Sequence, residues 1–174
     1  MTSALSLPAD ALVLLIGISG SGKTTFASRH FRPTQILSSD ALRAMIADDP
    51  TAQDATEDAF DLLHRLLEMR LRRGRLTVVD ATNVEEWARR VLVALARRHR
   101  RPVVAIVLDL PFEVLHQRNE VRRDGSRPRA ALTRQARWLR ESLLSLPNEG
   151  FDAVHRLGSA QEIDAVRVEL ERPR

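Results

Sequence analysis

The chain has 174 residues, of which 44% are hydrophobic and 29% charged, a composition typical of one soluble globular domain. It has no cysteine, which excludes a disulfide framework and a thiolate metal site, and its longest early apolar run is too short for a membrane span, so we expect a cytoplasmic protein without membrane association. The formal net charge of +4 is unevenly distributed, because residues 65–140 contain 19 basic and 8 acidic groups while both flanking segments are acidic, and this basic middle third suits a polyanionic partner or a triphosphate.

The first predicted elements are a buried strand over residues 11–16 and a helix over residues 24–30, separated by Gly17-Ile18-Ser19-Gly20-Ser21-Gly22-Lys23-Thr24. This is a G-x-x-x-x-G-K-S/T phosphate-binding loop in its expected strand–loop–helix context. Lys23 is the only lysine, and its compact ammonium suits the outer phosphates better than a planar guanidinium does. We therefore predict that ATP or another nucleoside triphosphate binds to Gly17, Ser19, Gly20, Ser21, Gly22, Lys23, Thr24 and Thr25.

A short strand over residues 34–37 and a helix over residues 42–47 are expected next. Asp40 lies between them, at the carboxyl end of the strand, and Arg43 follows three residues later on the same helical face. A carboxylate there suits acceptance of the proton from an attacking hydroxyl, and the guanidinium suits an anionic substrate group. The alternative is that Asp40 only caps the helix.

A helix over residues 55–73 and a buried strand over residues 76–80 follow, and the strand ends at Asp80. Asp80 and the Thr24 hydroxyl are the expected ligands for Mg²⁺ or Mn²⁺. The alternative is that Asp80 is only a polar strand end that caps the following turn. Ala81 stands where a hydrolytic motor usually places a glutamate that activates water. The absence of a glutamate directly after Asp80 therefore favours phosphoryl transfer to a bound acceptor over motor-type hydrolysis.

The remaining pattern alternates in the same way, with helices over residues 85–99, 111–123 and 130–146, strands over 103–109 and 153–157, and a capping box that opens a last helix at 159–162. Five strands separated by helices predict an α/β P-loop kinase fold in one domain spanning residues 1–174. Its five-stranded parallel sheet is flanked by helices on both faces. Ligands of such sheets bind at the carboxyl ends of the strands.

Several arginines surround a helix break at Asp124-Gly125 and predict a mobile lid over about residues 118–140: Arg118, Arg122, Arg123, Arg127 and Arg129. An arginine lid that closes on the triphosphate neutralises charge on the transferring group. The alternative is a solvated arginine-rich helix.

The phosphate loop, the run Leu37-Ser38-Ser39-Asp40-Ala41-Leu42-Arg43, the run Leu76–Val84 with its Asp80-Ala81-Thr82-Asn83, and Arg118-Asn119 resemble the kinase domain of bacterial polynucleotide kinase-phosphatases. The resemblance implies an end-healing enzyme that phosphorylates 5′-hydroxyl ends of RNA or DNA, with fused or partner phosphatase and ligase modules.

Carried over from the family, Lys23 and Thr24 hold the phosphates and the metal, Asp40 is the general base and Arg43 grips the acceptor. Arg118 and Arg122 contact the donor phosphates, and Asn83 contacts the substrate. The essential lid arginine is assigned to Arg127, with Arg122 and Arg123 as alternatives.

The expected function is therefore an ATP-dependent polynucleotide 5′-hydroxyl kinase acting in RNA or DNA repair. Two alternatives remain open: a small-molecule kinase acting on a sugar, nucleoside or antibiotic, and a nucleotide-dependent ATPase switch.

Overall fold

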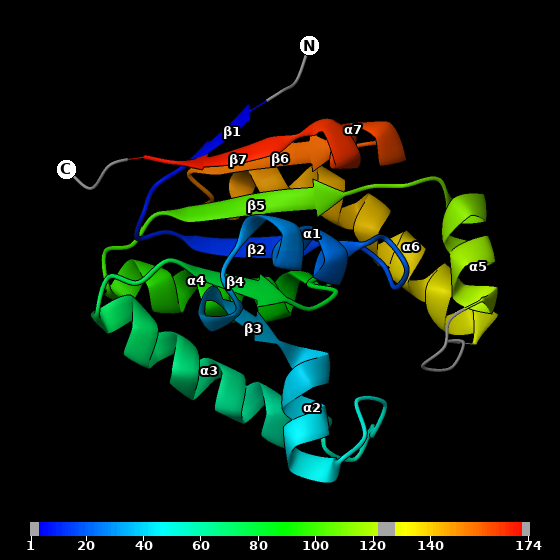
Figure 1. Cartoon of the computed structure of the whole chain (residues 1–174), viewed down its shortest axis with the longest axis horizontal. Helices are drawn as coiled ribbons and strands as arrows, with labels where there is room; N and C mark the ends of the chain where they lie inside the picture. The colour runs from blue at the N-terminus through cyan, green and yellow to red at the C-terminus, as the bar shows by residue number, and fades with distance from the viewer. Residues whose placement is uncertain (1–3, 122–127, 172–174) are drawn as a thin grey trace.

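The computed structural model describes residues 4–121 and 128–171 and contains a central parallel sheet with the strand order β3-β4-β2-β5-β6 (Figure 1). Its strands are β2 (Leu12–Ile16), β3 (Ile36–Ser38), β4 (Thr77–Asp80), β5 (Val103–Leu108) and β6 (Ala153–Leu157). The β2, β4 and β5 strands are buried along their whole length, as expected when helices cover both faces of a parallel sheet. The predicted fold class is confirmed.

Helices flank the sheet on both sides, with α1 in front of it and α6 behind it in Figure 1. An ion pair between Arg29 and Asp164 links α1 to α7, whereas a hydrogen bond between Arg89 and Ser142 links α4 to α6. The helices are α1 (Lys23–His30), α2 (Ser39–Ala47), α3 (Thr56–Arg72), α4 (Glu86–Arg98), α5 (Phe112–Glu120), α6 (Arg129–Ser145) and α7 (Ala160–Ala165), with 3₁₀ turns η1 (Pro33–Gln35) and η2 (Leu146–Asn148).

Two local predictions near the second strand were wrong. Residues 34 and 35 belong to η1 because Pro33 starts a 3₁₀ turn, so the strand β3 begins only at Ile36. The α2 helix begins at Ser39, three residues earlier than predicted, because the Ser38 hydroxyl accepts a hydrogen bond from the Ala41 amide. Asp40 therefore lies in the first turn of α2.

A second, two-stranded parallel sheet was not predicted from the sequence. It pairs β1 (Ala4–Leu7) with β7 (Arg167–Leu170), and it buries Leu5 and Leu7 in the core. The two strands come from opposite ends of the chain, so only the folded structure brings them together.

The lid predicted over about residues 118–140 includes the end of α5 and the first part of α6, and its closure stays a prediction. Its second half belongs to α6, a continuous helix that buries Leu139 in the core and whose Ser142 donates a hydrogen bond to the Val84 carbonyl. Figure 1 shows α5 beyond the carboxyl end of the sheet, with the first part of α6 beside it. Within residues 4–121 and 128–171, no helix is long and apolar enough to cross a membrane.

Candidate active site

The phosphate loop joins the carboxyl end of β2 to the first turn of α1. Gly22 caps α1 with a φ of 93°, in the left-handed region that favours glycine. At Gly17 a β-carbon would lie 2.6 Å from the Ser21 hydroxyl oxygen, so no larger residue fits there. The first turn of α1 holds no acidic residue and Gly22 supplies no side-chain cap, which leaves the helix N-terminus suited to an anion.

Lys23 is buried in the loop, and its ammonium faces the loop's own oxygens. Its Nζ donates to the carbonyl oxygens of Gly17 at 2.8 Å and Ile18 at 3.0 Å, and to the Ser21 hydroxyl at 3.4 Å. These contacts hold the ammonium beside the helix N-terminus, where a phosphate oxygen would replace one of the loop oxygens as an acceptor.

Thr24 and Asp80 lie side by side at the ends of α1 and β4. The Thr24 hydroxyl donates to an Asp80 carboxylate oxygen at 2.7 Å, and only 4% of Asp80 is exposed. Burial raises the pKa of Asp80; the Thr24 hydrogen bond and the Lys23 charge oppose that rise, and the Asp40 charge adds to it. Two hard oxygen donors beside a phosphate site fit Mg²⁺, which takes few protein ligands and completes its shell with water and phosphate.

We predict that Asp80→Asn leaves the nucleotide-free protein as stable as the wild type at neutral pH, or more stable. The reason is that the pKa of Asp80 is raised in the folded state, so its ionisation opposes folding, and the wild type gains stability as the pH falls through that pKa. Thermal unfolding of both proteins over a pH series, without metal, measures the effect. The excess stability of the variant should shrink towards acid pH, and a variant less stable than the wild type at pH 7 would contradict the prediction.

Asp40 and Arg43 form an ion pair within the first turns of α2. The Arg43 side chain is mostly buried and its Nε donates to the Pro50 carbonyl at 3.0 Å, whereas the Asp40 side chain is 45% exposed. Asp40 is not the N-cap, since Ser38 occupies that position. The pairing orients the carboxylate, and its exposed oxygen remains open to a substrate.

The structure brings these predicted residues to one edge of the sheet. In the pairing of β3 with β4, Ser38 lies opposite Asp80, so Asp40 follows two residues beyond that register. The charges of Lys23 and Asp40 both act on the pKa of Asp80, which places all three within electrostatic range of one another. The phosphate loop, the metal pair and the Asp40–Arg43 pair therefore share the carboxyl edge.

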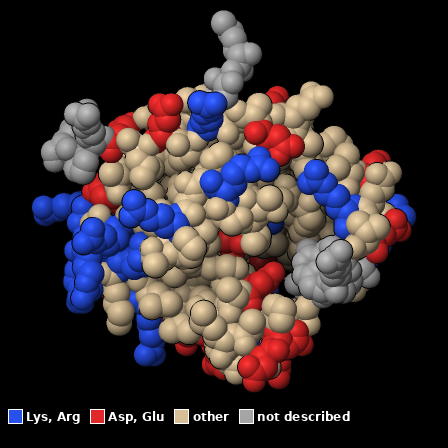
Figure 2. Space-filling view, in the orientation of Figure 1, with Lys and Arg blue, Asp and Glu red and all other residues tan. Residues whose placement is uncertain are grey.

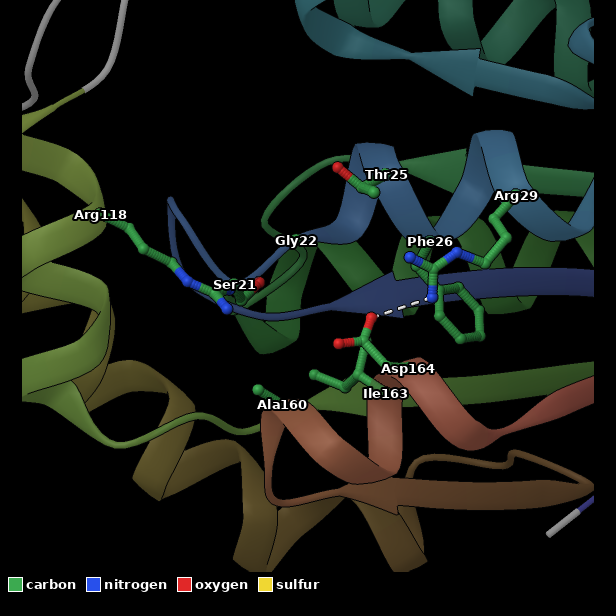
Figure 3. Close-up of a pocket in the computed structure, with 9 residues that line it drawn as sticks. All are labelled: Ser21, Gly22, Thr25, Phe26, Arg29, Arg118, Ala160, Ile163 and Asp164. Atoms are coloured by element: carbon green, nitrogen blue, oxygen red, sulfur yellow. Dashed lines mark hydrogen bonds and ion pairs between the residues drawn. The ribbon is translucent and has the colours of Figure 1, made fainter. Parts of the chain in front are cut away.

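Arg118 extends from α5 over the phosphate loop, and its Nη1 lies 3.4 Å from the Gly20 carbonyl oxygen (Figure 3). Beside it is a cavity of about 210 Å³ between α1, α5 and α7, lined by Thr25 and Phe26 and, on the α7 side, by Ala160 and Ile163. It exceeds the cavity of about 150 Å³ that binds benzene in an engineered protein, so it admits a flat ring.

Other predicted site residues are placed differently or lie outside the described residues. Asn83 was predicted to contact the substrate, but its side chain is 5% exposed and its Nδ2 donates to the Leu15 carbonyl at 2.7 Å. Its φ of 49° turns the chain after β4, so its side chain holds the loop in this structure, and a contact with the acceptor stays a prediction. Arg122, Arg123 and Arg127 lie outside the described residues.

Gln135 was not identified from the sequence. Its Oε1 accepts a hydrogen bond from the Ser19 amide at 2.9 Å, and this contact connects α6 to the phosphate loop. Gln135 lies in an arginine-rich amphipathic helix, 116 residues after Ser19, and no local pattern distinguishes it from other exposed-face residues. Only the packing of α6 reveals it.

On the face shown in Figure 2, acidic side chains gather at the bottom, in the region of α2 and the start of α3, and a basic cluster lies at the left, while both signs of charge occur over the rest of the face. The acidic residues are exposed and follow Asp40 and Arg43 in the chain: Asp48, Asp49, Asp54, Glu57, Asp58 and Asp61. Since Arg43 contacts Pro50, this acidic segment begins directly beside the Asp40–Arg43 pair.

The fold and the phosphate loop define a P-loop kinase-type nucleotide-binding domain, and known proteins agree with this class. A sugar kinase from Janibacter sp. has a TM-score of 0.58 at 22% identity, over 88% of this chain and 90% of that one. The APS kinase CysC of Mycobacterium tuberculosis, solved with AMPPNP and APS, has a TM-score of 0.55 at 18% identity, over 91% and 93%. These likenesses show the fold.

A chain of the Pnkp1/Rnl/Hen1 complex is 26% identical with a TM-score of 0.54, over 62% of this chain and 38% of that one. No curated protein matches the sequence closely enough to count as a relative. Residues 12–142 match the family model described as an AAA domain. The chain belongs to this AAA domain family.

Proposed function

We propose that the protein is a polynucleotide 5′-hydroxyl kinase that transfers the γ-phosphate of ATP to 5′-OH ends of RNA or DNA. The observation that carries the proposal is the Asp40–Arg43 pair at the carboxyl end of β3, beside the Thr24–Asp80 pair and the phosphate loop. The runs Leu37–Arg43 and Leu76–Val84, which resemble bacterial polynucleotide kinase-phosphatases, support the polynucleotide as acceptor.

In this proposal Lys23 and the amides of the α1 N-terminus hold the donor phosphates. Thr24 and Asp80 would hold Mg²⁺, which would neutralise negative charge on those phosphates. The 5′-hydroxyl oxygen forms a bond to the γ-phosphorus as the bond to the β-phosphate oxygen breaks, and ADP leaves. The exposed oxygen of Asp40 accepts the hydroxyl proton. A carboxylate suffices as the base because a loose transition state requires little deprotonation of the attacking hydroxyl.

Arg118 contributes to donor binding in this arrangement, with the nucleobase in the cavity beside it. Arg118→Ala is expected to weaken ATP binding about tenfold or more, because a hydrogen bond to a charged group contributes about 1.5–3 kcal/mol. Calorimetric titration with a non-hydrolysable ATP analogue measures the loss. Arg137→Ala, which removes an exposed arginine of α6, is the control, and equal affinities for both variants would contradict the assignment.

A small-molecule kinase is the second candidate, and the acidic segment beside Arg43 favours it. Six exposed carboxylates repel a phosphate backbone and suit a neutral or cationic acceptor such as a sugar or an amino-containing antibiotic. In the polynucleotide proposal, the acceptor strand approaches from the side of α5 and avoids this segment.

Incubation with γ-labelled ATP, Mg²⁺ and matched 5′-OH and 5′-phosphate oligonucleotides of RNA and DNA tests the proposal directly. Label on the 5′-OH oligonucleotide only is the expected result. Label on a sugar, nucleoside or aminoglycoside from a parallel panel, and on no oligonucleotide, would replace the proposal with the second candidate. Phosphate release without any acceptor would favour an ATPase switch.

A further inference from the structure

Arg89 of α4 is completely buried, although it is a charged residue far from the phosphate loop in sequence. Its guanidinium forms a bidentate ion pair with Glu149, with Nε–Oε2 and Nη2–Oε1 distances of 2.7 and 2.6 Å, and Glu149 is also almost fully buried. Burying two charges costs solvation that their attraction repays only in part, so such a pair is weak evidence for a stabilising role. The contacts of its remaining donor indicate another role.

The third nitrogen of Arg89 holds the loop that follows Asp80. Nη1 donates to the Asn83 carbonyl at 2.8 Å and to the Ser142 hydroxyl at 2.9 Å. The Ser142 hydroxyl in turn donates to the Val84 carbonyl at 2.7 Å. Two consecutive carbonyl groups of the loop over residues 81–85 therefore depend on one guanidinium, directly or through a single hydroxyl.

The opposite side of the same loop is bonded to the start of the phosphate loop. The Thr82 carbonyl accepts from the Gly17 amide at 3.0 Å, and the Asn83 side chain donates to the Leu15 carbonyl at 2.7 Å. The loop is thus held between the phosphate loop and Arg89, and it begins directly after Asp80. A shift of this loop would move Asp80 and Gly17 together.

We propose that Arg89 is a positioning residue of the phosphotransferase site. Supported by Glu149 and Ser142, it fixes the loop over residues 81–85, and thereby the position of Asp80 relative to Gly17 and the bound phosphates. The proposal rests on the proposed phosphoryl transfer, in which a misplacement of about 1 Å costs about 10²-fold in rate. A polar network in which each nitrogen of the guanidinium has an acceptor is suited to such a role because its hydrogen bonds specify one geometry, which an apolar contact does not.

Two variants test the proposal without deleting the buried pair. Arg89→Lys keeps the charge but replaces the planar donor fork with a single ammonium, and Ser142→Ala removes the link to Val84 while leaving the Arg89–Glu149 pair. Arg97→Lys is the matched control, because Arg97 also extends from α4 to the same turn, where it contacts Asp152 and the Gly150 carbonyl, but none of its contacts reaches the loop over residues 81–85.

Three measurements are made on each purified protein: the thermal unfolding midpoint, the kcat and nucleotide KM of transfer, and amide hydrogen exchange by peptide. For Arg89→Lys and Ser142→Ala, kcat should fall about tenfold or more with KM nearly unchanged, and exchange should accelerate in peptides covering residues 81–85 and 15–18. The Arg97→Lys control should show neither change. A fall in kcat that matches the unfolded fraction, or exchange that accelerates throughout the protein, would overturn the proposal.

Failure of the proposed function is distinguishable from failure of this inference. If the wild type transfers phosphate to no oligonucleotide, the polynucleotide kinase proposal is wrong. Hydrogen exchange and Mg²⁺-ATP affinity then still test the positioning role of Arg89. Faster exchange in residues 81–85 of the Arg89→Lys and Ser142→Ala variants, together with weaker Mg²⁺-ATP binding, then supports the positioning role of Arg89. Unchanged exchange in residues 81–85 overturns that role.

Discussion

An Asp40→Asn variant is expected to lose about 10²–10⁴-fold in turnover while it binds ATP as tightly as the wild type, because general-base catalysis contributes rate enhancements of this size. The amide keeps the shape of the carboxylate but does not accept the hydroxyl proton. Asp40 lies on α2, whereas the phosphate-binding groups lie on the loop before α1, so nucleotide affinity and turnover should separate. Single-turnover transfer and calorimetric ATP titration measure the two quantities.

The control is Asp48→Asn, at the other end of the same helix. Asp48 caps α2 with a φ of 56°, a conformation that asparagine adopts readily, so the substitution removes one charge nearby and keeps the backbone. It should retain normal turnover. Normal turnover of Asp40→Asn would show that Asp40 does not act as the base. It would also show that Arg43 can bind the acceptor without its carboxylate partner.

Lys23→Ala should abolish the thermal stabilisation that saturating ATP gives the wild type, and lower transfer by about 10²–10³-fold, the usual cost of removing a charge-stabilising donor. The ammonium is held by two loop carbonyls and the Ser21 hydroxyl, so its loss removes both a phosphate-binding group and the contacts that shape the loop. Thermal shift and transfer assays with the same nucleotide concentration check the result.

Lys23→Arg separates charge from geometry in this loop. The three oxygen acceptors of Lys23 converge on one nitrogen, an arrangement that suits an ammonium and not a planar guanidinium. We expect the arginine variant to fail nearly as completely as the alanine variant. Full activity of either variant would show that the loop does not depend on Lys23.

The parts of the site that lie within short sequence runs could be predicted from the sequence. The apolar runs of β2, β4 and β5 and the glycine pattern before Lys23 are local signals, and the structure places both as expected. The start of α2 was predicted three residues too late, because Ser38, Ser39 and Asp40 are all suited to the N-cap position. The hydrogen bond from the Ala41 amide to the Ser38 hydroxyl shows that Ser38 is the N-cap.

The contacts that hold the site together could not be predicted, because they join distant segments. Gln135 meets Ser19, Arg89 meets Glu149, and Asn83 turns inward to Leu15 only once the helices have packed on the sheet. In sequence, Arg89 is one of many arginines on an amphipathic helix and has no local feature that marks it as buried. Tertiary packing alone selects it.

The pairing of β1 with β7 has a consequence for how the protein acquires its structure during synthesis. Ala4–Leu7 is synthesised long before its only partner strand in the described structure, Arg167–Leu170. Contacts between such distant segments form slowly because a long loop must close first. The β1 strand, with its core residues Leu5 and Leu7, therefore stays unpaired until Arg167–Leu170 has emerged, and its docking is expected to follow the folding of the elements between them.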